Sequence, residues 1–183
     1  GRRTRGWPLC GWRQARPGRE AERPFEERPG LLEVAAAQNQ RLKILNHYLP
    51  EIVIRTRRER PPFIILDIDA SDDPTHGQQV LSFYHGHYDQ YQYFPLYVFD
   101  GTTGFPLAAW LRPGTVPSSC GAVDTLKTIV DALRRAWPDL TILIRRDGAF
   151  AVPALYEFCQ AAGLPSAFDY PTTAVLPRRP PPP

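Results

Sequence analysis

The pattern of apolar and polar positions divides the chain into an N-terminal helical segment and a core of alternating strands and helices. Apolar residues recur at roughly helical spacing from Leu31 to Leu49, which predicts a helix over residues 31–56, and Pro50 should break or kink it. Apolar runs predict strands over residues 63–69, 92–99, 105–111 and 140–144. Helical spacing predicts two further helices over residues 120–136 and 153–162.

The composition places boundaries around this core. Residues 1–30 show no period and predict an irregular or disordered basic arm, while residues 31–60 combine the helix with a basic linker. The core is predicted over residues 61–168, and a Pro-rich tail over residues 169–183. The strand and helix order, β-β-β-α-β-α, predicts an α+β or mixed α/β fold, and it is also the order of a ribonuclease-H-like fold.

The charge is unevenly distributed, which bears on possible partners. Residues 1–60 hold 14 basic and 7 acidic residues, a net of +7, whereas residues 61–183 hold 8 and 12, a net of −4. A basic arm joined to an acidic core suits a nucleic-acid enzyme, although a solvated Arg-rich tail explains the same numbers. The linker arginines Arg55, Arg57, Arg58 and Arg60 are the candidate DNA contacts.

The cysteine spacing and the lack of a long apolar run indicate in which compartment the protein is expected. The three cysteines form no Cys-x-x-Cys pair, so a disulfide framework or zinc ribbon is not expected. No apolar run approaches the ~20 residues of a membrane span, and the Arg-rich start is unlike a secretory signal. We therefore expect a cytoplasmic protein without a membrane partner.

Two carboxylates on one apolar strand are the most informative chemical feature. Asp67 and Asp69 alternate along the run Phe63 to Asp69, so both point to the same face of the strand. Buried carboxylates are costly unless they are paired or bound to metal. Asp72 and Asp73 follow in a polar turn and are expected to be solvated.

A second strand also ends in an acid. Asp147 follows Leu140–Ile144, and Arg145 shares its face, where it could pair with a carboxylate or a phosphate. In a ribonuclease-H-like fold the first and fourth strands are parallel neighbours, so Asp69 and Asp147 would meet although 78 positions separate them. Such a pair could hold divalent metal for phosphoryl transfer, whereas a turn-capping role for Asp147 is the alternative.

Histidine and tyrosine offer weaker alternatives. His76, His85 and His87 could bind zinc, but turn or hydrogen-bonding roles explain them equally well. A tyrosine-rich stretch over residues 84–97 could stack on bases, although aromatic residues packing a sheet are the commoner outcome.

Four motifs resemble a family of bacterial insertion-sequence transposases of the DDE class, which have a ribonuclease-H-like core. They are residues 66–79, 83–89, 111–114 and 144–150, in matching order and spacing, and the resemblance covers about residues 31–168. In that family two Asp and one Glu hold two Mg²⁺ ions. The family's Asp-small-Ser/Thr motif matches Asp69-Ala70-Ser71, and its Arg-x-Asp-x-x-Phe motif matches Arg145 to Phe150.

The resemblance therefore implies Asp69 and Asp147 as catalytic metal ligands, with Asp67 as an alternative or supporting carboxylate and Arg145 as a supporting residue. It implies Mg²⁺ as the metal, insertion-sequence DNA ends as the partner, and a homodimer in the complete protein. The expected third acid has no match after residue 168, and Glu157 comes too early. We expect a truncated or frame-shifted copy with weak or absent metal binding, and the sequence leaves open whether it is an active enzyme.

Two other functions fit the same residues. The chain could be a non-catalytic DNA-binding remnant that uses its arginines against phosphates, in which case its binding weakens steeply with salt. It could also be a different ribonuclease-H-like nuclease.

Overall fold

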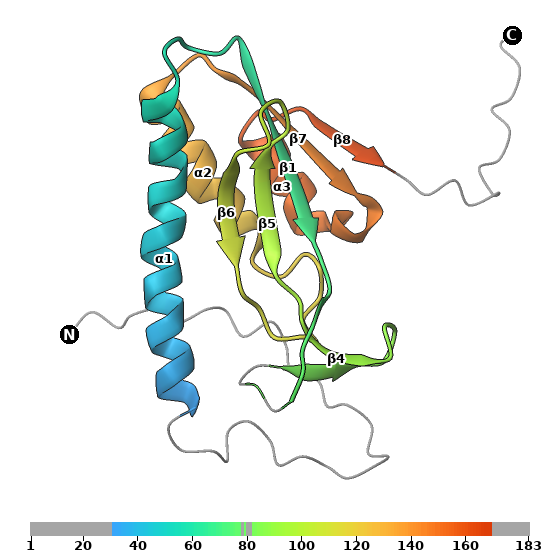
Figure 1. The fold of residues 1–183 in the computed structure, drawn as a ribbon. Helices are drawn as coiled ribbons and strands as arrows, with labels where there is room; N and C mark the ends of the chain where they lie inside the picture. Colours follow the sequence, from blue (N-terminus) through green and yellow to red (C-terminus); the bar gives the residue numbers. More distant parts are fainter. Residues whose placement is uncertain (1–30, 78, 80–81, 170–183) are drawn as a thin grey trace, which may run out of the picture.

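A computed structural model describes residues 31–77, 79 and 82–169 as a five-stranded mixed sheet, a small three-stranded sheet and three α-helices (Figure 1). The main sheet has the order β6-β5-β1-β7-β8. Its strands are β1 (Phe63–Ala70), β5 (Leu96–Asp100), β6 (Pro106–Trp110), β7 (Thr141–Asp147) and β8 (Ser166–Asp169). Strand β5 runs antiparallel to β1 and β6, and β7 is parallel to β1 and β8.

This topology confirms the expected mixed α/β, ribonuclease-H-like fold. The first strand lies beside the strand that follows α2, and the two are parallel, as the fold requires. Strands β5 and β6 form a hairpin, because they pair antiparallel across residues 101–105.

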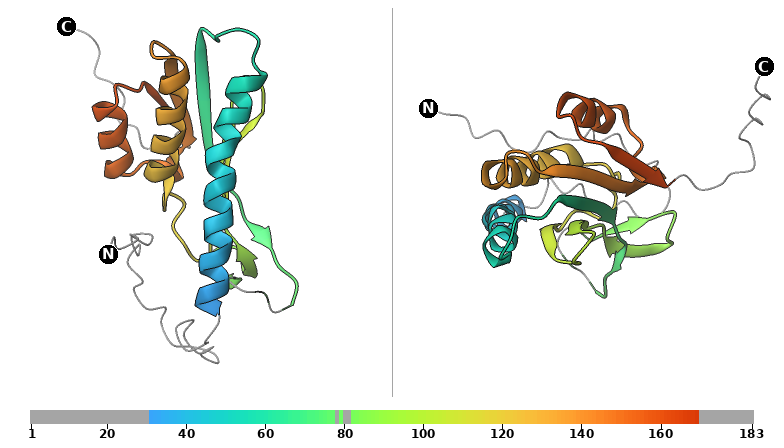
Figure 2. Two further views of the ribbon diagram at one scale, coloured as in Figure 1. Left: turned by 90° about the vertical axis from the view of Figure 1, so that its left-hand side faces the viewer. Right: turned by 90° about the horizontal axis from the view of Figure 1, so that it is seen from above.

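Helices α2 (Ala122–Ala136) and α3 (Pro153–Ala161) lie on one side of the main sheet (Figure 2). Alternate strand residues such as Ile64, Leu66 and Ile144 are fully buried against them. The other face has no helix over it in the described ranges, and it carries the odd-numbered positions of β1 and β7. Packing on one face therefore leaves the other open to a ligand.

Helix α1 (Leu31–Thr56) runs beside the edge strand β6 (Figure 1). Of the two effects predicted for Pro50, a break or a kink, the break is wrong, because the helix continues to Thr56. Pro50 and Val53 are buried, so packing of the last turns offsets the hydrogen bond that proline cannot donate.

A second sheet follows β1 in the chain. It consists of β2 (Asp73–Pro74), β4 (Gln90–Tyr93) and β3 (Phe83–His85), paired antiparallel in that order. The predicted strand over residues 92–99 is therefore two strands in two sheets. The break falls at Phe94 and Pro95, where proline offers no N–H to a ladder and Phe94 N donates instead to Arg112 O at 3.1 Å.

The end of the core also differs from expectation. Strand β8 pairs in parallel with β7 and crosses the predicted boundary between core and tail at residue 168. Its four residues, Ser-Ala-Phe-Asp, carry too little apolar pattern for a sequence prediction. The predicted basic arm over residues 1–30 and the tail from residue 170 lie outside the described residues, so the domain boundaries stay predictions.

Candidate active site

Asp69 and Asp147 lie at the carboxyl ends of adjacent parallel strands. The pairing of β1 with β7 runs from Phe63 beside Thr141 to Ile68 beside Arg146, and the next position on each strand is an aspartate. Both aspartates are exposed, and both sit at the odd-numbered positions that face away from the helices. The structure thus brings together two acids that are 78 positions apart in sequence.

Each of these carboxylates has one oxygen tied to the backbone. Asp69 Oδ1 accepts from Ala70 N at 2.8 Å. Asp147 Oδ1 accepts from Ala149 N at 3.0 Å and so caps the 3-10 turn η2 (Gly148–Phe150). The turn-capping alternative for Asp147 is therefore observed, and it fixes the side chain without occupying both oxygens.

Asp67 is in a different situation from Asp69. Arg145 lies beside it across the strand pair and donates from Nε to Asp67 Oδ1 at 2.6 Å and from Nη2 to Oδ2. Hydrogen bonding to Asp67, followed by the charge of that carboxylate, raises the pKa of the Arg145 guanidinium above its usual range. Of the two partners foreseen for Arg145, a carboxylate or a phosphate, the structure shows the carboxylate.

Arg146 points the other way, as alternation along the strand predicts. It is buried on the helical side, with its guanidinium carbon 4.8 Å from the ring centre of Tyr156 on α3. On the open side, β5 flanks the carboxylates with two aromatic rings, because Asp67 pairs with Phe99 and Asp69 with Tyr97. The ring centres of Tyr97 and Phe99 are 5.9 Å apart.

The carboxylate oxygens at the ends of β1 and β7 suit a hard divalent cation. Carboxylate oxygens are the ligands that Mg²⁺ prefers, and a Mg²⁺ site usually needs only one or two protein carboxylates beside water and phosphate. Asp69 and Asp147 meet that requirement. Within the described ranges, no three His, Cys, Asp or Glu side chains are grouped so that they could share a metal ion.

The predicted DNA-contacting arginines are not equivalent. Arg57 pairs with the fully buried carboxylate of Asp100, so its charge is used inside the fold. Arg60 lies 3.8 Å from the exposed Asp139, whereas Arg55 and Arg58 are exposed on α1 and just after it. These residues precede β1, whose eight residues span about 25 Å at roughly 3.3 Å each, so they lie at the end of the sheet opposite Asp69.

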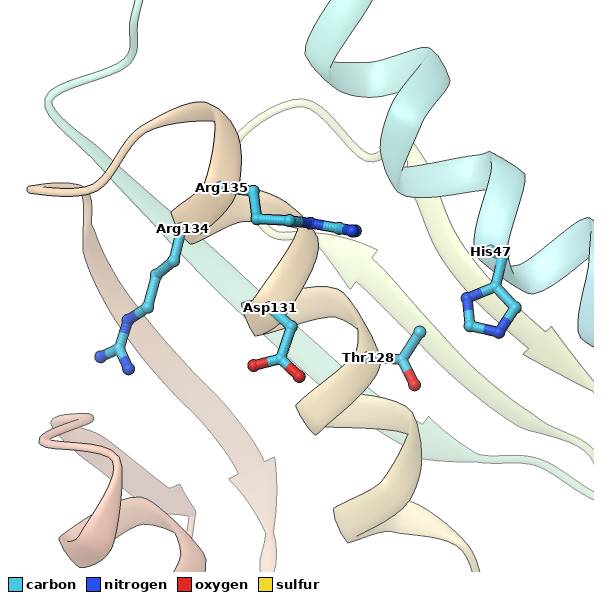
Figure 3. Close-up of a pocket in the computed structure, with 5 residues that line it drawn as sticks. All are labelled: His47, Thr128, Asp131, Arg134 and Arg135. Carbon is cyan, nitrogen blue, oxygen red and sulfur yellow. The ribbon is translucent and has the colours of Figure 1, made fainter.

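A hollow of about 640 Å³ lies between α1 and α2, on the helical side of the sheet (Figure 3). His47 on α1 faces Thr128 and Asp131 on α2, and Arg134 and Arg135 complete the wall. Arg134 is already bonded to Ala162 O at 2.6 Å. This hollow is separated from the carboxylates by the sheet, so the candidate chemistry lies on an open face rather than in a pocket.

The aromatic stretch mainly packs against itself. Tyr84 and Tyr91 form an edge-to-face pair with ring centres 5.6 Å apart, and His85 lies 5.9 Å from Phe94. Tyr84 and Tyr91 remain about half exposed, at 49% and 47%. Asp72 is exposed, as expected for a turn residue, and accepts from Gln90 Nε2 at 3.0 Å.

Sequence reasoning missed Gly101. Gly101 approaches Asp67 so closely that a Cβ atom there would lie 2.6 Å from Asp67 Oδ2. Gly101 lies in the connection between β5 and β6, and nothing in the sequence pattern links it to a strand 34 positions earlier.

The strand order, with β1 parallel to β7 and antiparallel to β5, is that of a ribonuclease-H-like sheet. Residues 31–180 match the family model described as transposase DDE domain group 1. The chain belongs to this transposase family, which confirms the resemblance of its motifs to DDE transposases. None of the curated proteins compared with the chain matches it.

Solved structures similar to the chain include two transposases and a retroviral integrase. The piggyBac transposase synaptic complex with hairpin DNA is 16% identical over 59% of this chain, with a TM-score of 0.40. The catalytic domain of Mos1 mariner transposase is 14% identical over 69%, with a TM-score of 0.40, and the HTLV-2 integrase catalytic core with magnesium is 17% identical over 62%, at 0.35.

This chain spans 23%, 59% and 64% of those three chains. At such TM-scores the likenesses are too loose to define the role of any residue. In the described ranges, no helix combines the length and the apolar character that crossing a bilayer requires.

Proposed function

We propose that this chain carries the metal-binding end of a DDE transposase core, which acts in DNA strand cleavage and strand transfer. The observation that supports it most is the position of Asp69 and Asp147 at neighbouring ends of the parallel strands β1 and β7, on a face that no described helix covers. Membership of the transposase family is independent support.

The two aspartates hold oxygen donors at fixed positions. Backbone N–H groups of Ala70 and Ala149 each fix one carboxylate oxygen, which limits rotation of the side chain and leaves the other oxygen for a ligand. A bound Mg²⁺ would polarise the phosphodiester and activate the attacking oxygen. An open sheet face suits a DNA duplex, which is too wide for the hollow between α1 and α2.

The partners follow from this proposal. We infer that the DNA is an insertion-sequence end, that the complete protein acts as a homodimer, and that it works in the cytoplasm. Arg55, Arg58 and Arg60 are proposed to contact phosphates away from the reacting bond, whereas Arg57 serves the fold.

Metal binding tests the proposal without requiring turnover. Titration of the full chain with Mn²⁺, followed by the electron paramagnetic resonance of the free ion, should show binding that is lost in Asp69→Asn and in Asp147→Asn. Asp131→Asn, an exposed acid on α2, is the matched control and should bind as the wild type does. A short DNA duplex should tighten Mn²⁺ binding to the wild type, because phosphate oxygens complete the coordination.

Mn²⁺ binding that persists unchanged in both Asp69→Asn and Asp147→Asn would show that the metal site is elsewhere. Tightening by DNA that is equal in the variants and the wild type would contradict a shared metal and phosphate site. Tryptophan fluorescence and circular dichroism of each variant would verify that the fold is retained.

A further inference from the structure

Asp67 and Asp69 share a face of β1, and the sequence alone does not say which of them binds metal. In the structure the two carboxylates have different surroundings. Both oxygens of Asp67 are engaged by the guanidinium of Arg145, one by Nε and one by Nη2. This bidentate arrangement adds energy and fixes the relative orientation of the two groups.

A second contact confines Asp67 from the opposite flank. Gly101, in the turn between β5 and β6, donates its N–H to Ile65 O at 2.8 Å. An added Cβ at residue 101 would meet Asp67 Oδ2 at 2.6 Å and Asp67 Cγ at 3.0 Å. The Asp67 side chain, which is 27% exposed, is thus enclosed between the hairpin turn and Arg145.

Asp69 has neither restraint. It is exposed, and its Oδ1 accepts a hydrogen bond from Ala70 N. Asp69 and Asp147 lie two positions beyond Asp67 and Arg145 on their strands. The charges of Asp67 and Arg145 cancel each other. The four side chains sum to a net charge of −2.

The arginine also needs its carboxylate. Arg145 lies on the same strand face as Asp147, two positions away, a separation of about 7 Å. Without Asp67, the guanidinium would be drawn to Asp69 or Asp147 and would compete with a cation there. Without Arg145, Asp67 would add a third negative charge to the edge.

We propose that Asp67 is a positioning residue and not a metal ligand: its pair with Arg145 keeps both charges away from the metal, which Asp69 and Asp147 bind. This inference rests on the proposed metal-binding function. The Asp67–Arg145 pair would then set the net charge at the carboxyl ends of β1 and β7 and the position of the guanidinium there.

A double-mutant cycle measured by Mn²⁺ affinity tests the assignment. In Asp67→Asn the freed arginine should weaken Mn²⁺ binding about 10-fold, a size common for residues that support metal ligands. In Arg145→Gln the freed carboxylate should strengthen binding. The double variant D67N/R145Q restores a net charge of −2 and should return to within about 3-fold of the wild type.

A ligand role for Asp67 gives a different result. In that case Asp67→Asn and the double variant would both lose Mn²⁺ binding as completely as Asp69→Asn, because removing Arg145 cannot replace a missing carboxylate ligand. That outcome would overturn the inference while leaving the proposed function intact. Wild-type protein that binds no Mn²⁺ would remove the proposed function and the inference together.

Two further variants keep the test decisive if a substitution disturbs folding. Arg145→Lys keeps the positive charge without the fork and should lie between wild type and Arg145→Gln in Mn²⁺ affinity. If D67N/R145Q does not fold, Asp67→Thr combined with Arg145→Val keeps β-branched residues that strands accept, and the same rescue is expected of it.

Discussion

Asp100 is a single buried carboxylate that joins a turn to the segment after α1. It is fully buried, accepts from Thr102 N at 3.0 Å and from the hydroxyl of Thr103 at 2.7 Å, and pairs with Arg57. Burial raises the pKa of Asp100, but the hydrogen bonds from the two threonines and the charge of Arg57 outweigh it, so the pKa is lowered overall.

A lowered pKa in the folded state makes Asp100 a source of acid sensitivity. The ionised carboxylate contributes stability above the unfolded pKa of about 4, and this contribution is lost as the pH falls through the folded pKa. We expect Asp100→Asn to lower the free energy of unfolding at pH 7 by about 3 kcal/mol, because Arg57 loses its partner. Urea denaturation between pH 7 and pH 2.5 should also show a weaker pH dependence than in the wild type.

Asp131→Asn is the control for this experiment, because Asp131 is exposed on α2. Its unfolding free energy should follow the pH dependence of the wild type. Parallel curves for Asp100→Asn and wild type would contradict the role of Asp100.

At the residue scale, sequence patterns predict which face of a strand a side chain occupies better than they predict which residue it pairs with. Alternation correctly placed Arg145 on the face of Asp147 and Arg146 on the opposite face. It did not predict that Arg57 would serve Asp100, because the two are 43 positions apart and a turn aspartate is usually solvated. Burial of Asp100 depends on how the segment after α1 lies against the end of β5, which no local pattern encodes.

Among the elements, the edge strand β6 is the one that most needs protection. An edge strand presents unpaired N–H and C=O groups that can pair with another chain. Here the buried side chain of Asn46 on α1 satisfies both groups of Ala109, donating to Ala109 O at 2.9 Å and accepting from Ala109 N at 2.6 Å. Helix α1 thus acts in place of a further strand at this position.

We expect Asn46→Ala to reduce the free energy of unfolding by about 2–3 kcal/mol, because two hydrogen bonds are lost and their backbone partners stay shielded from water. The amide of Ala109 should exchange with solvent faster in the variant. Urea denaturation and amide hydrogen exchange measure the two effects. His47→Ala, the exposed neighbour on the same helix, should change neither, and an unchanged Ala109 exchange rate in Asn46→Ala would disprove the protective role.

Long periodic elements were predictable from the sequence, and short ones were not. The limits of α2 and α3 differ from their predictions by one or two residues, because each presents a clear apolar stripe between turn residues. Strands β2 and β8 have two and four residues and gain their order from neighbours rather than from their own pattern. Pro50 is a similar case in a helix, since tertiary packing outweighs the tendency of proline to end a helix.

At the scale of the whole molecule, the exposed arginines after α1 and the two candidate metal-binding aspartates lie at opposite ends of the main sheet. Arg58 and Arg60 precede β1, while Asp69 and Asp147 follow the far ends of β1 and β7. A DNA molecule that touched both ends would lie along the sheet for about 25 Å, or roughly seven base pairs at 3.4 Å each.

We therefore expect the triple variant R55Q/R58Q/R60Q to weaken DNA binding and to flatten its salt dependence. Each arginine that contacts a phosphate contributes about 0.9 to the slope of log affinity against log salt. Fluorescence anisotropy of a labelled duplex at several salt concentrations measures this slope. Lys127→Gln with Arg135→Gln, both exposed on α2, is the charge-altering control and should leave the slope unchanged.

The buried Arg112 and the glycine beyond it connect the two sheets. Arg112 donates to Phe94 O at 2.7 Å and to Cys120 O at 2.7 Å, and burial lowers its pKa to about 10. Tyr93 bridges to Pro113, and Gly114 packs directly on backbone carbonyls of Phe83 and Gln92, where any side chain would collide. The small sheet is therefore attached at the end of the main sheet where Asp69 lies, so a DNA molecule that bound both sheets would be held in one position relative to Asp69.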